Sequence, residues 1–186
     1  MPSTVRRSSS VAVRLLLAAA LAAAVTVALY VTGRHQTPDY TAELFGRSGA
    51  AAVRLKAWLA TVVLGLAVVQ LALALWMYGR LPGVHRVPRG VRTAHRLCGV
   101  LLFAVTVPVA VQCMRGYGVE TTGPRVVAHA VAGCFFYGAF AAKVLLVRSR
   151  RLPGWVLPLA GGALVATVAV LWYTAALWYF NGYALP

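Results

Sequence analysis

The chain has 186 residues, of which 61% are hydrophobic, and its mean hydropathy is +0.77. It is too apolar for a soluble domain of this length, and it contains several apolar stretches of about 20 residues, the length that a membrane-spanning helix needs. The formal net charge of +15 would indicate nucleic acid as the partner of a soluble protein. Here the basic residues flank the apolar stretches, so membrane topology explains them, and the expected partner is the lipid bilayer rather than nucleic acid.

Five segments are predicted to span the membrane: 15–32, 57–78, 94–114, 127–147 and 155–178. Each is long enough, at about 1.5 Å per residue, to cross a hydrocarbon core of about 30 Å. Backbone polar groups cannot stay unpaired in lipid, and the alternating pattern of a barrel is absent, so the spans are expected to be helices. The predicted fold class is all-α, a single membrane domain over residues 1–186. Short connections predict an antiparallel four-helix core of the last four spans, with one added N-terminal helix.

The first span is rich in Ala, Leu and Val, which is typical of a membrane anchor. Its basic start and its small residues also fit a cleaved signal peptide, although an apolar run of about 18 residues is longer than the usual hydrophobic region of such a peptide. Both interpretations remain open. The exterior loop 33–56 follows, and within it the segment "TAELF" (41–45) is expected to open a short helix at the membrane interface.

The positive-inside rule predicts the orientation of the chain. One side collects many arginines and no acidic residue, including those of the basic loop 79–93: Arg6, Arg7, Arg14, Arg80, Arg86, Arg89, Arg92, Arg96, Arg148, Arg150 and Arg151. That side is expected to be cytoplasmic, and the other side carries all three acids of the chain, Asp39, Glu43 and Glu120. Five spans then place the N-terminus in the cytoplasm and the C-terminus outside.

Ionisable side chains inside a span cost about 2.5–3.5 kcal/mol or more at its centre, so each one is a candidate functional residue. The third and fourth spans both open with Ala-His-x-x-x-Gly, as "AHRLCG" at 94–99 and "AHAVAG" at 128–133. A glycine one turn after a histidine leaves room beside the imidazole for a flat group such as a haem edge. The same glycine equally favours close packing of two helices, which needs no cofactor.

The run "HRLCGVLLFAVTVPVAVQC" followed by "HAVAGCFFYGAFAAKVLL" resembles the core of cytochrome b561-like and ferric-reductase-like membrane haem proteins. The chain also resembles, over most of residues 35–184, an uncharacterised family of small bacterial membrane proteins named only as a domain of unknown function. The first resemblance implies haem b and an electron carrier whose partner is a quinol, a cupredoxin or a respiratory complex. The second implies the bacterial inner membrane. The implied haem-site residues are His95 and His129 as iron ligands, Gly99 and Gly133 beside them, and Lys143 near a propionate.

Antiparallel helices place the two motif histidines at opposite faces, His95 near the cytoplasm and His129 near the exterior. About 20–30 Å of bilayer then separates them, so they cannot bind one iron. Each needs its own partner, and the remaining histidines are in loops: His35 outside and His85 inside. On the outer side Cys113 and Met114 are weaker substitutes as haem ligands, and the same residues with His35 and His129 offer an alternative copper site.

Two functional classes therefore stay open. One is a transmembrane oxidoreductase or electron carrier with haem b, and the other is a haem-free accessory or assembly protein of a membrane complex. Hydrolysis is not expected, because no Ser/His/Asp arrangement is visible and acidic residues are few. Ion-coupled transport is weakly supported, because no predicted span contains a carboxylate.

Overall fold

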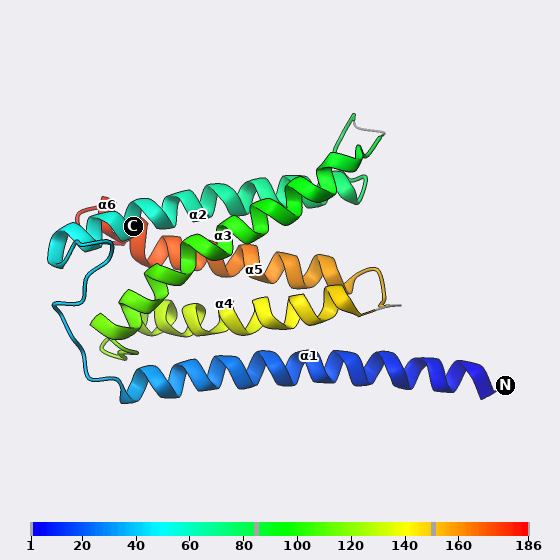
Figure 1. Ribbon diagram of the computed structural model, residues 1–186, viewed down its shortest axis with the longest axis horizontal. Coiled ribbons are helices and arrows are strands. Elements are labelled where there is room, and N and C mark those ends of the chain that lie inside the picture. The colour runs from blue at the N-terminus through cyan, green and yellow to red at the C-terminus, as the bar shows by residue number, and fades with distance from the viewer. Residues whose placement is uncertain (1, 84–85, 150–151, 186) are drawn as a thin grey trace.

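The computed structural model describes residues 2–83, 86–149 and 152–185, with side chains described from residue 11 onward. The described part is helical (Figure 1), with helices α1 (Pro2–His35), α2 (Gly49–Met77), α3 (Arg89–Gly116), α4 (Pro124–Arg148) and α5 (Val156–Trp172). The last of these continues as a π-helical segment, η1 (Tyr173–Leu177), and a final turn, α6 (Trp178–Phe180). Five stretches, α1 to α4 and the continuous run α5–η1–α6, are long and apolar enough to cross a membrane. The all-α, five-span prediction is confirmed.

Several helices extend beyond the predicted spans. The first begins at Pro2 rather than at residue 15, and the second begins at Gly49 rather than at residue 57. Residues 3–32 contain neither Gly nor Pro, and alanines follow Gly49, so good helix formers continue the helix past the apolar run. Hydropathy therefore locates the part of each helix that lies in lipid, but it does not locate the helix ends.

The prediction of a short helix at 41–45 is wrong. Leu44 and Arg47 exchange backbone hydrogen bonds of 2.8 and 3.1 Å, which closes a tight turn. Within it Phe45 and Gly46 have φ angles of 50° and 73°, which no right-handed helix contains. The segment instead docks onto α3, because Gln112 Nε2 donates a 3.1 Å hydrogen bond to the carbonyl oxygen of Ala42.

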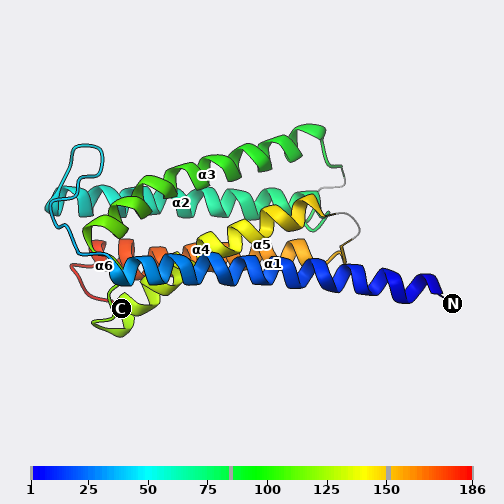
Figure 2. The same ribbon diagram turned by 60° about the horizontal axis from the view of Figure 1, so that its bottom comes forward.

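The helices pack in the order α1, α4, α5, α2, α3, each against the next, as Figures 1 and 2 show from two sides. Helices α2 to α5 alternate in direction and form the four-helix core, and α1 lies outside it against α4. The end of the bundle that carries the C-terminus is called the C-terminal end; there α1, α3 and α6 end and α2 and α4 begin. At the N-terminal end, α2 and α4 finish and α3 and α5 begin.

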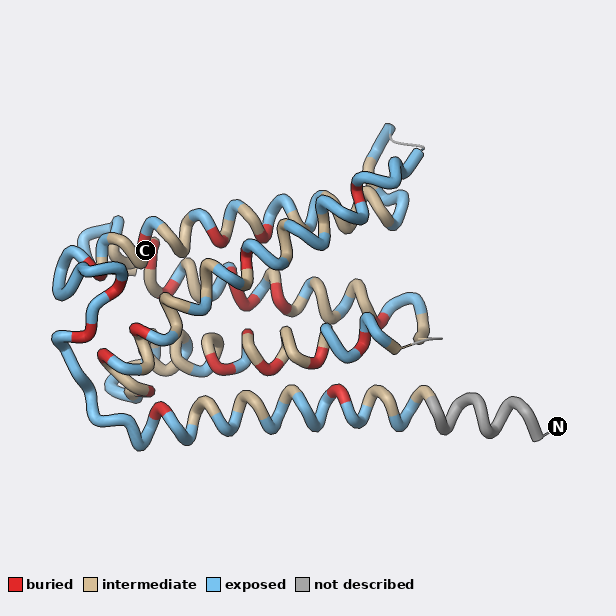
Figure 3. The backbone as a smooth tube through the Cα atoms, viewed as in Figure 1, coloured by how far each residue is buried: buried red, intermediate tan, exposed pale blue. Residues whose placement is uncertain are grey.

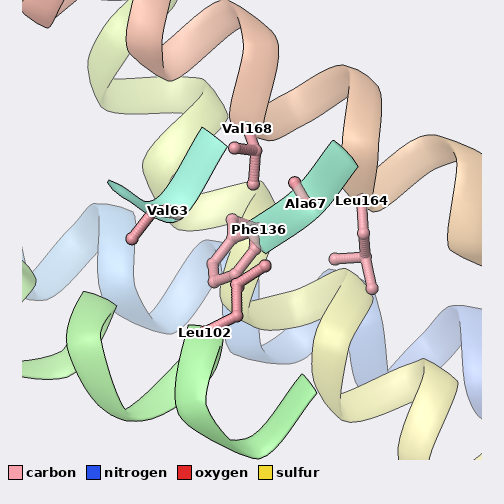
Figure 4. Close-up of a cluster of buried hydrophobic side chains, with 6 residues drawn as sticks. All are labelled: Val63, Ala67, Leu102, Phe136, Leu164 and Val168. Atoms are coloured by element: carbon pink, nitrogen blue, oxygen red, sulfur yellow. The ribbon is translucent and has the colours of Figure 1, made fainter. Parts of the chain in front are cut away.

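The middle of the bundle is a cluster of buried apolar side chains from all four core helices (Figure 4): Val63, Ala67, Leu102, Phe136, Leu164 and Val168. Outward-facing side chains at mid-span are exposed, as for Val68 at 57% and Val100 at 62%, and exposed residues alternate with less exposed ones along each helix in Figure 3. These side chains would face lipid. Because lipid is as apolar as the core, close van der Waals packing rather than the hydrophobic effect holds the helices together.

Helices α1 and α4 make a close contact at Gly138. Any Cβ at this position would overlap the hydroxyl of Thr26 and the carbonyl oxygen of Ala22, so the two backbones touch there. In contrast, α3 and α4 make few close backbone contacts and meet mainly through rings at mid-depth. The ring of Phe103 stacks on that of Phe140 with centroids 4.2 Å apart. Beyond this contact, the core is open toward the C-terminal end.

Candidate cofactor cavity

A cavity of about 520 Å³ fills the C-terminal half of the bundle, between the pair α2/α3 and the pair α4/α5. The buried cluster, through Val63, Phe136 and Val168, forms its floor, and the connection after α3 passes beside it at residues 117–120. Cavities of about 300–1,000 Å³ with mainly apolar walls and a few polar groups are typical of small-molecule and cofactor sites. This cavity has that size and that composition.

The cationic side chains of the cavity come from opposite walls. Lys56 of α2 lies with its Nζ 3.8 Å from the Sγ of Cys113 and 4.5 Å from the ring centre of Tyr117. Across the cavity, Arg125 of α4 places its guanidinium 3.7 Å from the ring centre of Trp178. Each cation thus lies over an aromatic face, a favourable arrangement in a site partly shielded from water.

His129 of α4 lines the same cavity, and its ring is held by Thr174. The Nδ1 atom lies 2.9 Å from Thr174 Oγ1, and that hydroxyl in turn donates a 2.7 Å hydrogen bond to the carbonyl oxygen of Val170. A hydroxyl has one proton to donate, so Thr174 accepts from the Nδ1–H of His129. The lone pair of the imidazole is then on Nε2. This tautomer, with Nδ1–H bound to the protein, is the one that metal-ligating histidines use when they bind through Nε2.

Thr174 belongs to the π-helical segment η1, and single π-turns are frequent at functional sites. Its backbone carbonyl accepts a 2.8 Å hydrogen bond from Arg125 Nη1, so the first turns of α4 are joined to η1 by two contacts. Sequence reasoning missed this residue. A signal was available, because Thr174 is the one aliphatic hydroxyl in the run 168–180.

The two Ala-His-x-x-x-Gly motifs are not equivalent in space. Gly133 lines the cavity, and a Cβ added there would meet only Leu171 Cδ2, at 3.9 Å. At Gly99 the corresponding space is filled, because Gln70 Nε2 lies 2.9 Å from the position of such a Cβ. The same amide donates a 2.6 Å hydrogen bond to the carbonyl oxygen of His95. The second motif therefore faces an open space, and the first is part of a packed contact.

Of the other predicted site residues, Cys113 and Met114 line the cavity, whereas Lys143, His95 and His35 do not. Lys143 lies toward the N-terminal end, with its Nζ 3.7 Å from the Cβ position of Gly161. His35 is exposed at the end of α1, and His85 lies outside the described residues. Within the ranges that the structure describes, no group of three or more His, Cys, Asp or Glu residues is placed to hold a metal ion.

Comparison with known proteins gives one match. Neither curated proteins nor solved structures yielded a similar chain. Residues 15–186 match the family described as "Family of unknown function (DUF6529)". Because this match covers nearly the whole sequence, the chain belongs to that family.

Proposed function

We propose that the protein is a membrane electron carrier that holds one b-type haem in the cavity, with His129 as an iron ligand. The observation that carries the proposal is the pair His129 and Thr174, which presents an imidazole with its lone pair on Nε2 in a cavity of about 520 Å³. The resemblance of the His-x-x-x-Gly motif to cytochrome b561-like proteins supports it. Haem bound there would supply one-electron redox chemistry.

The residues around the cavity fit such a group. Gly133, one turn after His129, leaves space beside the imidazole, and apolar side chains form the walls. Lys56 and Arg125 place positive charge near the C-terminal end, where the two carboxylates of the group would be neutralised. Cys113 and Met114 of α3 also line the cavity and would be weaker ligands for the group.

The role of the chain is to orient and shield the group. Thr174 fixes the ring of His129, and the apolar floor keeps the cavity closed toward the N-terminal end. In the orientation proposed from the arginines, the N-terminus lies in the cytoplasm and the cavity lies near the exterior face of a bacterial inner membrane. The fitting electron partners are therefore a quinol in the outer leaflet, an exterior cupredoxin or the exterior side of a respiratory complex.

A haem-free accessory role is the second candidate, and the packing around Gly99 favours it for the first motif. Gln70 occupies the space where a flat group would lie beside His95, so this motif serves helix packing. If the second motif also serves helix packing and binds no haem, the cavity would hold a lipid tail or a side chain of a partner protein.

A reduced-minus-oxidised visible spectrum of the detergent-purified protein separates the two candidates. The haem proposal predicts sharp b-type bands that disappear in His129→Ala and persist in His95→Ala, which is the matched control because both are motif histidines. A colourless preparation from haem-replete cells, or equal bands in wild type and His129→Ala, would overturn the proposal and leave the accessory role.

A further inference from the structure

A layer of polar side chains lies inside the bundle on the N-terminal side of the apolar cluster. Each member lies at helical spacing from a buried core residue of its own helix, so all of them are on inward faces. The pairs are Val63 and Gln70 on α2, Leu102 and His95 on α3, Phe136 and Lys143 on α4, and Leu164 and Gly161 on α5. Three helices thus contribute a polar side chain to one layer, and Gly161 of α5 leaves space in it. The proposed haem site does not use this layer.

Lys143 is directed into this layer and does not run along the lipid surface. Its Nζ lies 3.7 Å from the Cβ position of Gly161 on the neighbouring helix, so the missing side chain at Gly161 makes room for the ammonium group. The side chain is partly buried. No hydrogen bond or ion pair of Lys143 is found within the described ranges, and all three acidic residues of the chain lie in the connections at the C-terminal end. This cation therefore has no protein counter-charge.

His95 gives the layer a second polar group without a partner. Its Nδ1 is buried and has no hydrogen-bond partner in the part of the chain that the structure describes. Leu102 and Phe136 belong to one buried cluster, and His95 and Lys143 each lie seven residues from them toward the N-terminal end, so the two side chains are at the same depth in the bundle. Gln70 does not serve His95 Nδ1, because its amide is bound to the backbone carbonyl of the same residue. A buried polar atom without a partner and a cation without an anion are both costly in a membrane, and one anionic ligand would satisfy both.

The depth of the layer indicates the source of that ligand. Lys143 lies five residues before the end of α4 at Arg148, and His95 lies six residues after the start of α3 at Arg89. The predicted span of α3 begins at residue 94 and that of α4 ends at residue 147, so at about 1.5 Å per residue both side chains lie within about 6 Å of the end of an apolar run. Hydrocarbon gives way to lipid headgroups near that point. Further positive charge follows at the same end, from Arg92 and Arg96.

We infer that Lys143 and His95 form a binding site for a phosphate-type anion at the N-terminal end of the bundle. Lys143 supplies the charge, and the Nδ1–H of His95 donates a hydrogen bond. An anionic phospholipid of the adjacent leaflet and free phosphate share this chemistry. The site is independent of the proposed haem, because the packed apolar cluster separates the two.

Binding of dioctanoyl phosphatidylglycerol to the delipidated, detergent-purified protein, followed by native mass spectrometry, tests this inference. Loss of a hydrogen bond to a charged group predicts at least about 10-fold weaker binding in Lys143→Met, with binding kept in Lys143→Arg. Arg148→Gln is the matched control, because it removes the same charge from an exposed position at the same end and should bind as wild type.

A parallel titration with inorganic phosphate identifies the source of the anion. Competition with the lipid assigns the site to the phosphate group itself, and lack of competition assigns it to the intact lipid. Equal losses in Lys143→Met and Arg148→Gln would show general surface attraction and overturn the inference. Absence of saturable lipid and phosphate binding by the wild type would overturn it as well. Comparison of Lys143→Arg with wild type keeps the test decisive if Lys143→Met does not fold.

Discussion

Gly138 provides the sharpest test of how α1 joins the core. The change Gly138→Ala adds one methyl group where the hydroxyl of Thr26 and the carbonyl oxygen of Ala22 already fill the space. The Thr26 hydroxyl could turn away, but it would lose its 2.7 Å hydrogen bond to that same carbonyl, and the backbone oxygen cannot move without shifting α1. Overpacking of this kind costs about 1–3 kcal/mol.

Gly65→Ala, in the middle of α2, is the matched control. Apart from the adjacent residues of α2, no heavy atom of the described residues lies within 4 Å of its new methyl group, and Gly65 does not line the cavity. Both variants gain about 0.8–1 kcal/mol from the better helix propensity of alanine, so the free energies of unfolding of the two variants should differ by about 1–3 kcal/mol, with Gly138→Ala the less stable. Unfolding in a titration with denaturing detergent, followed by circular dichroism, measures this difference. Equal stability of the two variants would refute the close contact between α1 and α4.

Two further predictions concern single hydrogen bonds. Thr174→Val removes the acceptor of His129 Nδ1–H and should weaken haem binding about 10- to 100-fold, the usual effect of losing such a partner. Thr174→Ser keeps the hydroxyl and should bind as wild type in a haem titration. Equal haem affinity of the wild type and both variants would contradict the assigned tautomer. In the loop after α1, hydrogen bonds from the Thr41 hydroxyl and amide hold the pKa of Asp39 below its usual value. The turn is therefore fully stabilised above about pH 4 and loses that stabilisation as the pH falls through the lowered pKa. Carbon-13 NMR should show the Asp39 carboxyl titrating below about pH 3.9 in the wild type and at a higher pH in Thr41→Ala. A titration midpoint at a lower pH in Thr41→Ala than in the wild type would contradict the assignment.

Much of the fold follows from the sequence, because lipid allows few choices. Long apolar runs must be helices, and short connections make neighbours antiparallel. The helix ends did not follow, since alanines after Gly49 continue α2 beyond the apolar run, with Ala50 and Ala51 exposed and Ala52 buried. The turn at Leu44 to Arg47 was missed because a pattern suited to an interfacial helix is overridden by left-handed backbone at Phe45.

The candidate site was predicted in part. Spacing alone placed His129 and Gly133 on one face of a helix, and both do line the cavity. The difference between the two motifs could not be read from the sequence, because it depends on whether a side chain from another helix fills the space beside the glycine. Gln70 does so at Gly99, 29 positions away in the chain, and no residue does so at Gly133 among those described.

The ratio of haem to polypeptide tests the central claim most directly. Purified protein from haem-replete cells, assayed by the pyridine haemochrome method against quantitative amino-acid analysis, should contain one b-type haem per chain, held in the cavity by His129. A ratio of two would mean that the packed space beside His95 also takes a haem, and a ratio of zero would mean that the cavity serves another purpose; either result would contradict the account.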